Sequence, residues 1–164
     1  MATVGTSYRT ILKALKQYLI DEQVLLEGEV YFTFRQNPPA LDNKRSLAIV
    51  PLYQNFLQES TEGHGRCGIF KKARVSIYYR HEANLDQTFE DDTWLLDDEG
   101  LLAVLERVED ALDLWMPQDA QGAFLLNQPA RALMQNEPRK DYKDHSRGDS
   151  MVEVEFEYRA QRTV

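Results

Sequence analysis

Hydrophobic residues recur along the chain with two different periods, and each period predicts a different kind of element. From Thr6 to Ile20 they return every three or four positions, which is the spacing of an amphipathic helix. Thr6 or Ser7 offers a side-chain oxygen that can cap the first turn. The same spacing returns from about Asp98 to Trp115, where acidic residues suit a helix start and Pro117 stops the helix. The sequence therefore predicts two amphipathic helices.

Four other segments alternate hydrophobic and polar residues with the period of a β-strand. They are Glu29 to Phe34, Ser46 to Tyr53, Lys72 to His81 and Met151 to Arg159. In the first of them, Val30, Phe32 and Phe34 are expected on one side of the strand. Pro51 has no amide hydrogen to donate, and the second strand is therefore expected at a margin of the sheet.

The last of these strands has the cleanest alternation. Its hydrophobic residues, expected to pack in the core, are Val152, Val154, Phe156 and Tyr158. Glu153, Glu155 and Glu157 fall on the opposite side. These glutamates have two interpretations: the solvated face of an antiparallel strand, or the lining of a channel in a symmetric ring, where negative charge lets DNA slide without adhering.

The elements together predict an α+β fold, with a mostly antiparallel sheet of about four to five strands and two amphipathic helices packed on one face. A length of 164 residues suits one hydrophobic core. We therefore expect a single domain over residues 1–164, with long loops near residues 35–45 and 118–149.

The second of these loop regions is expected to hold one strand followed by a long polar loop. That loop, residues 136–150, has the sequence NEPRKDYKDHSRGDS, and compact domains seldom carry such a polar stretch unless it binds something or orders late. Its candidate interface residues are Arg139, Lys140, Tyr142 and Lys143.

Charge limits the partners of this chain. With 27 acidic and 19 basic residues its formal net charge is −8, which argues against a surface that holds nucleic-acid phosphates. A net charge of this size also keeps a domain soluble. No hydrophobic run is long enough for a membrane helix, and the first residues lack the features of a secretory signal, so we expect a protein that stays in the cell that makes it.

Motifs of catalysis or ligand binding are missing from the sequence. The three histidines His64, His81 and His145 share no metal-ligand spacing and are expected in surface loops. The glycine-rich stretch near Cys67 lacks the Gly-Lys-Ser/Thr ending of a phosphate loop. We therefore expect no enzymatic activity, no cofactor and no metal. A hydrolase or nuclease that uses scattered carboxylates with His81 or His145 stays open as an alternative.

The order of elements resembles that of the tail-terminator and tail-completion (head-tail joining) proteins of tailed bacteriophages. Two segments carry most of the resemblance. In one, KARVSIYYRHE leads through an acidic connector to the helix GLLAVLERVEDALDLW; the other is the closing strand MVEVEFEYRA. The likeness spans most of the chain, although the segments Arg35 to Arg45 and Gln118 to Arg147 extend beyond the family's simple pattern.

This resemblance implies a structural virion protein of the tail or neck, assembled in the host cytoplasm. Such proteins form a ring, commonly a hexamer, that ends the tail tube and joins it to the head, while DNA passes through the lumen without specific binding. The implied partners are copies of itself, the tail tube protein and neck or connector proteins. Another connector or tube ring protein, and a tail-assembly chaperone or binding module, stay open as alternatives.

Overall fold

The computed structural model describes residues 5–34, 45–56, 70–82, 95–140 and 147–160. Its elements, in chain order, are α1 (Tyr8–Asp21), the 3-10 helix η1 (Glu27–Glu29), β1 (Val30–Phe32), β2 (Arg45–Phe56), β3 (Phe70–Glu82), α3 (Leu101–Leu112), β4 (Arg131–Lys140) and β5 (Arg147–Arg159). The predicted α+β class is confirmed.

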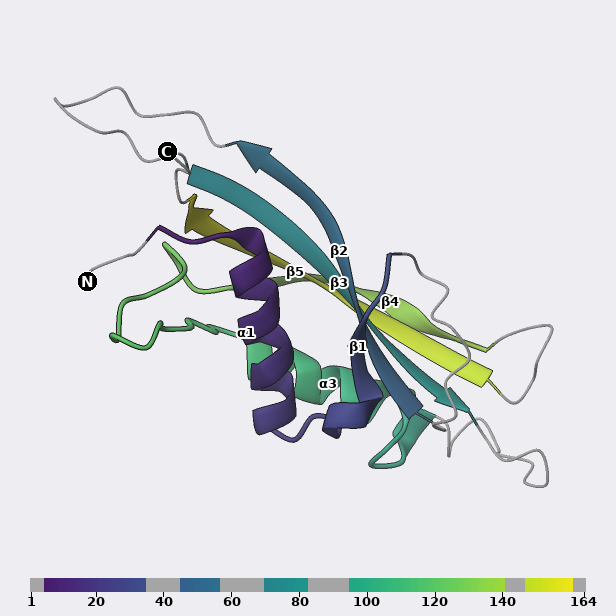
Figure 1. Cartoon of the computed structure of the whole chain (residues 1–164). Helices are drawn as coiled ribbons and strands as arrows, with labels where there is room; N and C mark the ends of the chain where they lie inside the picture. The colour runs from purple at the N-terminus through teal and green to yellow at the C-terminus, as the bar shows by residue number, and fades with distance from the viewer. Residues whose placement is uncertain (1–4, 35–44, 57–69, 83–94, 141–146, 161–164) are drawn as a thin grey trace, which may run out of the picture.

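The strands of the described chain form one five-stranded sheet in the order β1-β2-β3-β5-β4 (Figure 1). The pairs β2 with β3, β3 with β5 and β5 with β4 are antiparallel, whereas β1 runs parallel to β2. The pairing of β3 with β5 is continuous, from Phe70 opposite Arg159 to Glu82 opposite Arg147. The sheet is therefore mostly antiparallel, as predicted, and its centre is a long two-stranded ribbon.

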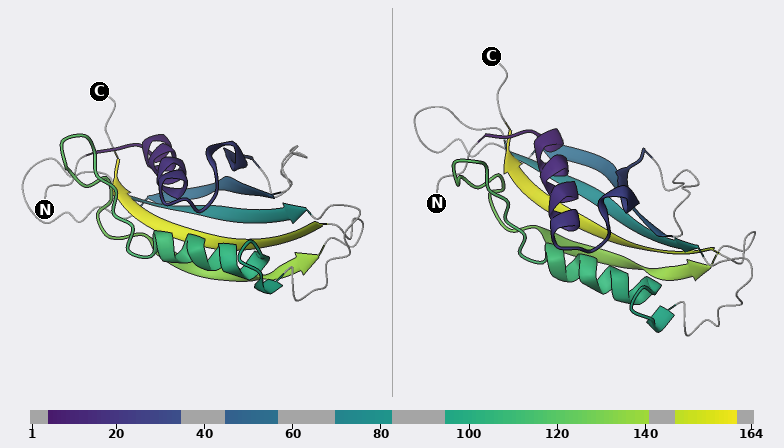
Figure 2. Two further views of the ribbon diagram at one scale, coloured as in Figure 1. Left: turned by 90° about the horizontal axis from the view of Figure 1, so that it is seen from below. Right: turned by 60° about the horizontal axis from the view of Figure 1, so that its bottom comes forward.

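Both helices pack on the same face of this sheet because each has one hydrophobic side (Figure 2). The buried residues of α1 are Ile11, Leu12, Leu15 and Leu19, and those of α3 are Leu101, Val104, Leu105, Val108 and Leu112. They meet the inward residues of the central ribbon: Ala73, Val75, Ile77, Tyr79, Val152, Val154, Phe156 and Tyr158. The rings of Tyr18 and Trp115, with centroids 5.8 Å apart, connect α1 to the segment that follows α3.

The helix starts show which capping residues the chain uses. Of the two candidates at α1, Ser7 is the cap, because its Oγ accepts a hydrogen bond from the Thr10 amide at 3.2 Å. Thr6 instead donates its amide to the carbonyl oxygen of Arg159 at 2.8 Å, which holds the two ends of the described chain together. Helix α3 begins only after Gly100, later than the predicted start at Asp98.

Strand β2 lies between β1 and β3 and not at the margin predicted for it, but Pro51 falls in a part of β2 that β1 does not cover. The parallel pairing of β1 with β2 runs from Leu47 to Ile49 and stops before Pro51. At the proline, β2 therefore needs no amide donor toward β1, and the register with β3 shifts between Pro51 and Gln54.

Strand β1 is shorter than the strand predicted from Glu29 to Phe34. Val30 is buried, but Phe32 is 40% exposed and Phe34 is fully exposed. The strand ends at Phe32 and is an edge strand that pairs only with β2 among the described strands. Val30 is therefore its one buried residue. Alternation of hydrophobic residues therefore did not predict where the strand ends or how far the core extends.

The long polar loop predicted at residues 136–150 is also wrong. Strand β4 continues to Lys140, and β5 already begins at Arg147, so most of this segment is an antiparallel pair. Pro138 is accommodated because β4 is the edge strand and its register shifts between Asn136 and Arg139. An edge strand can contain many polar residues because backbone pairing holds it in the sheet. The polar composition of residues 136–150 was therefore not evidence for a loop. Residues 141–146 lie outside the described chain.

Candidate functional site

The sheet face opposite the helices carries most of the charge of the central strands, and we call it the charged face. Antiparallel register places Arg74 of β3 directly opposite Glu155 of β5, with side chains on the same side of the sheet. The described charged residues of this face are Lys72, Arg74, Arg80, Arg131, Asp149, Glu153, Glu155, Glu157 and Arg159. Basic and acidic side chains are therefore close to balanced, although β5 alone looks acidic.

Glu155 is the most buried glutamate of the predicted channel lining, with 8% of its surface exposed. Its two carboxylate oxygens lie 3.0 Å from Lys72 Nζ and 3.0 Å from Arg74 Nε. Burial acts to raise the pKa of Glu155, but the hydrogen bonds from Lys72 and Arg74 outweigh it and hold the pKa below its ordinary value. Glu155 is thus a charged partner of two cations.

Glu153 and Glu157 are also engaged. Glu153 lies 4.0 Å from Arg74 Nη1, the longest of these ion pairs. Glu157 accepts hydrogen bonds from the side-chain amides of Asn127 at 3.4 Å and Gln128 at 3.1 Å. The structure therefore brings the three predicted glutamates onto one face but gives each of them a protein partner.

The predicted interface loop is divided by the structure. Arg139 and Lys140 belong to β4, where they pair with Asp149 and Gly148 of β5. Tyr142 and Lys143 lie outside the described residues.

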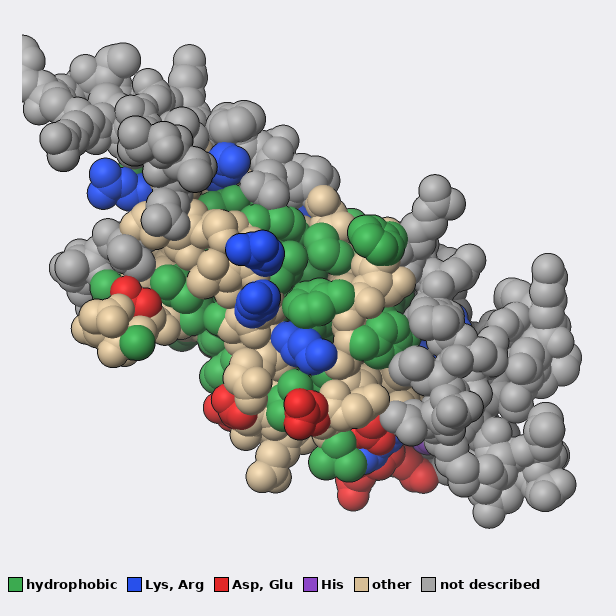
Figure 3. All heavy atoms as spheres, in the orientation of Figure 1, with side chains coloured by type: hydrophobic (Ala, Val, Ile, Leu, Met, Phe, Trp, Pro, Cys, Tyr) green, Lys and Arg blue, Asp and Glu red, His purple; other side chains and the backbone are tan. Residues whose placement is uncertain are grey.

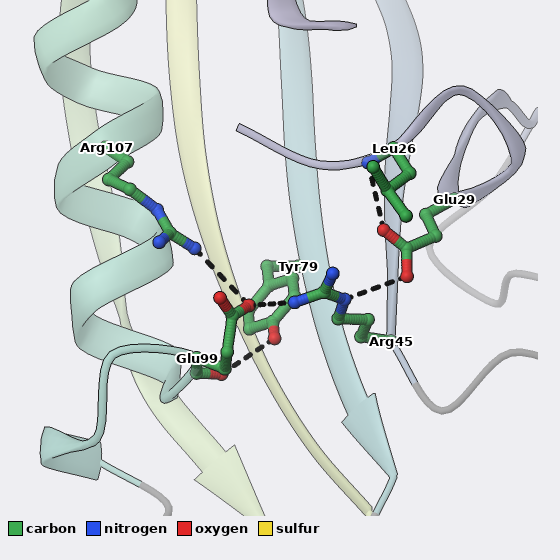
Figure 4. A network of polar contacts seen from close by, with 6 residues as sticks. All are labelled: Leu26, Glu29, Arg45, Tyr79, Glu99 and Arg107. Atoms are coloured by element: carbon green, nitrogen blue, oxygen red, sulfur yellow. Dashed lines mark hydrogen bonds and ion pairs between the residues drawn. The ribbon is translucent and has the colours of Figure 1, made fainter. Parts of the chain in front are cut away.

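A second polar cluster connects η1, β2, β3 and α3 at one end of the sheet (Figure 4). Arg45, at the start of β2, donates from Nε to Glu29 at 2.8 Å and pairs through Nη1 with Glu99. The hydrogen bond with Glu29 is the largest cause of the raised pKa of Arg45. The other carboxylate oxygen of Glu29 accepts the Leu26 amide at 2.9 Å, so one arginine connects η1 to the segment before α3.

Glu99 also joins this cluster to β3 and α3. Its backbone carbonyl accepts the hydroxyl of the fully buried Tyr79 at 2.8 Å, and its carboxylate lies 3.5 Å from Arg107 (Figure 4). Burial raises the pKa of Tyr79, which keeps the phenol neutral and donating. The acidic residues before α3 were expected to favour the helix start; in the structure Glu99 forms ion pairs with Arg45 and Arg107.

The structure decides between two expectations for His81, which ends the predicted strand from Lys72 and was also expected in a surface loop. His81 lies in β3, half-buried beside the ring of Tyr79, rather than in a surface loop. Burial is the largest cause of its lowered pKa. Among the residues that the structure describes, no group of three or more His, Cys, Asp or Glu side chains could hold a metal ion. No described helix is both long and apolar enough to cross a membrane.

An apolar groove that the sequence analysis missed lies between α1 and the β1 edge of the sheet. Its volume is about 300 Å³, and its lining residues are Arg9, Leu12, Lys13, Phe32, Thr33, Phe34 and Pro51. Figure 3 shows basic and hydrophobic side chains next to one another on this face. Lys16 adds a cation 5.9 Å from the centre of the Phe32 ring. The clue in the sequence was the set of lysines and an arginine on the outer side of the first helix.

No family model matches the chain, and no curated protein matches it. Solved structures with a similar fold do match it. A solved chain from a structure described as "Virion of native gene transfer agent (GTA) particle" superposes with a TM-score of 0.55 at 15% identity, covering 94% of this chain and 100% of the other. At this identity the likeness establishes a shared fold.

Proposed function

We propose that this protein is a structural component of a phage-like virion, without enzymatic activity. It forms a ring, of about six copies by the resemblance noted from its sequence, that ends the tail tube and joins it to the head or neck. Its partners are copies of itself, the tail tube protein and neck or connector proteins, and DNA passes through the lumen.

The observation that carries this proposal is the likeness to a chain of a gene transfer agent virion along the whole length of that chain. A match that covers both chains compares complete folds rather than a common supersecondary motif. The element order of tail-terminator proteins, noted from the sequence independently of the structure, supports the same class of protein.

The charged face is the proposed lining of the channel, with Glu153, Glu155 and Glu157 as its candidate residues. These glutamates would do more than repel the phosphates of DNA. Because Glu155 binds Lys72 and Arg74, it removes two cations that would otherwise bind DNA phosphates. A face with near-balanced charge gives DNA few sites to adhere to.

The experiment that tests the proposal is localisation in the particle. The chain carries a small tag, is expressed with the remaining virion genes, and is located by electron microscopy of purified particles. A ring at the junction between tail tube and head is the expected result. A position within the tube or higher in the neck indicates the alternative of another ring protein, and absence from finished particles indicates an assembly chaperone.

A further inference from the structure

The apolar groove beside α1 exposes large hydrophobic side chains that the described part of the chain leaves uncovered. Phe34 is fully exposed and Phe32 is 40% exposed, both at the β1 edge of the sheet. The groove carries the exposed cations Arg9 and Lys13, one helical turn apart on α1. A partner that covers this groove therefore needs a hydrophobic side chain flanked by acidic ones.

The opposite edge of the sheet presents such a surface. The end of α3 and the start of β4 surround a hollow of about 510 Å³. Its lining includes Glu109, Asp110, Asp113 and Leu114, and Arg131 is the one basic residue among them. Because β1 and β4 are the two edges of the sheet, one chain carries a basic-apolar surface at one edge and an acidic-apolar surface at the other.

Leu114 is not explained by the fold of a single chain. It follows the last turn of α3 with a φ of 59°, a left-handed conformation for which glycine is the usual residue at this position. A leucine here is strained, and its side chain is 70% exposed. Both features disfavour leucine in an isolated chain, whereas a partner that buries the side chain would account for it.

We propose that the groove of one copy receives the end of α3 of the next copy in the ring. Leu114 then packs against Phe32 and Phe34, while Asp110 and Asp113 face Arg9 and Lys13. The contact joins two different surfaces, which is the head-to-tail arrangement that closes into a ring. This inference rests on the proposed ring and specifies its interface.

Charge reversal tests the contact in the full-length chain. One variant carries Arg9→Glu with Lys13→Glu, and the other carries Asp110→Lys with Asp113→Lys. Each alone places like charges at every contact and should raise the concentration needed for assembly, measured by sedimentation, by about tenfold or more. An equal mixture should restore assembly, because alternating copies pair opposite charges at every contact in a ring of even number.

The matched control is Glu22→Lys with Glu27→Lys, which makes the same change in net charge as the second variant at exposed positions away from both surfaces. It should assemble like the wild type. Leu114→Gly separates assembly from folding, because glycine accepts the left-handed backbone without strain. Below the assembly concentration its unfolding temperature should not fall, while its assembly weakens.

Several outcomes would overturn the inference. If the wild type assembles and both reversed variants and Leu114→Gly assemble equally well, the ring stands and this interface is wrong. If the variants form normal rings but fail to enter particles, the groove belongs to another virion protein. If the wild type stays a monomer even with tail tubes, the ring itself fails.

Discussion

Glu155 lies 3.0 Å from each of two cations, Lys72 and Arg74, on a strand whose sequence alone suggests an unpaired acidic ridge. Both cations come from β3, where they alternate with the same period as the glutamates of β5. The pairing is therefore a cross-strand interaction fixed by register. It gives the charged face its balance, on which the proposed passage of DNA depends.

Replacement of Glu155 by Gln tests this pairing through its pH dependence. Both cations are about one-third exposed, so near neutral pH the variant should lose about 1 kcal/mol of unfolding free energy at most. The folded pKa of Glu155 lies below its ordinary value of 4.5, so its contribution is complete above that pH and disappears as pH falls through the folded pKa. Urea unfolding at several pH values measures the difference.

The two proteins should therefore converge in stability in acid. Glu106→Gln, at an exposed position on α3, is the control and should track the wild type throughout. A difference between wild type and Glu155→Gln that stays constant down to acid pH would show that the carboxylate charge is not what matters.

For individual residues of β5, the sequence predicted which side of the sheet each side chain lies on, but not which residues it contacts. The inward positions Val152, Val154 and Phe156 are buried as the alternation predicted. The partners of the glutamates could not be predicted, because they depend on which strand lies beside β5 and in what register. The left-handed backbone of Leu114 could not be predicted either, because no pattern in the sequence indicates that conformation at a leucine.

At the scale of elements, side chains of the sheet hold the start of α3. Tyr79 donates its hydroxyl to the Glu99 carbonyl at 2.8 Å, and Ser150 donates to the Leu101 carbonyl at 3.1 Å. Both donors are buried, and both acceptors lie where the chain enters the helix. Helix α3 has no side-chain cap at Gly100, so these bonds contribute to fixing its position.

Tyr79→Phe removes one of these bonds without changing the packed ring. The expected loss of unfolding free energy is about 1 kcal/mol, the usual contribution of a buried hydrogen bond, plus the cost of an unsatisfied carbonyl if water does not reach it. Tyr18→Phe, at a half-buried ring on α1, is the matched control and should change stability little. Equal stability of the two variants would argue against the role given to Tyr79.

Phenylalanine truncations at two strands compare the core with the groove. Phe156 is 2% exposed and its ring centroid lies 5.8 Å from that of Tyr8, so Phe156→Ala should cost about 3–5 kcal/mol. Phe32→Ala, at the exposed edge strand, should cost less than about 1 kcal/mol in the monomer. Chemical unfolding below the assembly concentration measures both, and similar losses would contradict the assignment of Phe32 to a surface.

Elements with a strong period were predicted well and those without one were not. Helix α1 and strands β3 and β5 follow their patterns closely because each has one face in the core. Strand β4 was partly mistaken for a loop, since an edge strand is held by backbone pairing and its polar residues and Pro138 carry no alternating signal. The parallel pairing of β1 likewise follows from topology rather than from the residues of β1.

At the scale of the whole molecule, the fold separates the two faces of the sheet and its two edges. The helices cover one face of the sheet, the charged face lies on the other, and the two edges carry surfaces of opposite charge. In the proposed ring the edges meet between copies and the charged face borders the channel. The fold class was predictable from the sequence, but the opposite charges at the two edges became visible only once the strand order was known.

The mass of the assembled protein shows most directly whether the chain forms a ring. Native mass spectrometry across a range of concentrations, with purified tail tubes added in a parallel series, gives the number of copies without assuming a shape. We expect a closed assembly of one discrete size, about six copies, that appears as a ring with an open centre by electron microscopy. A single-chain mass under all these conditions, with no binding to tail tubes, would contradict it.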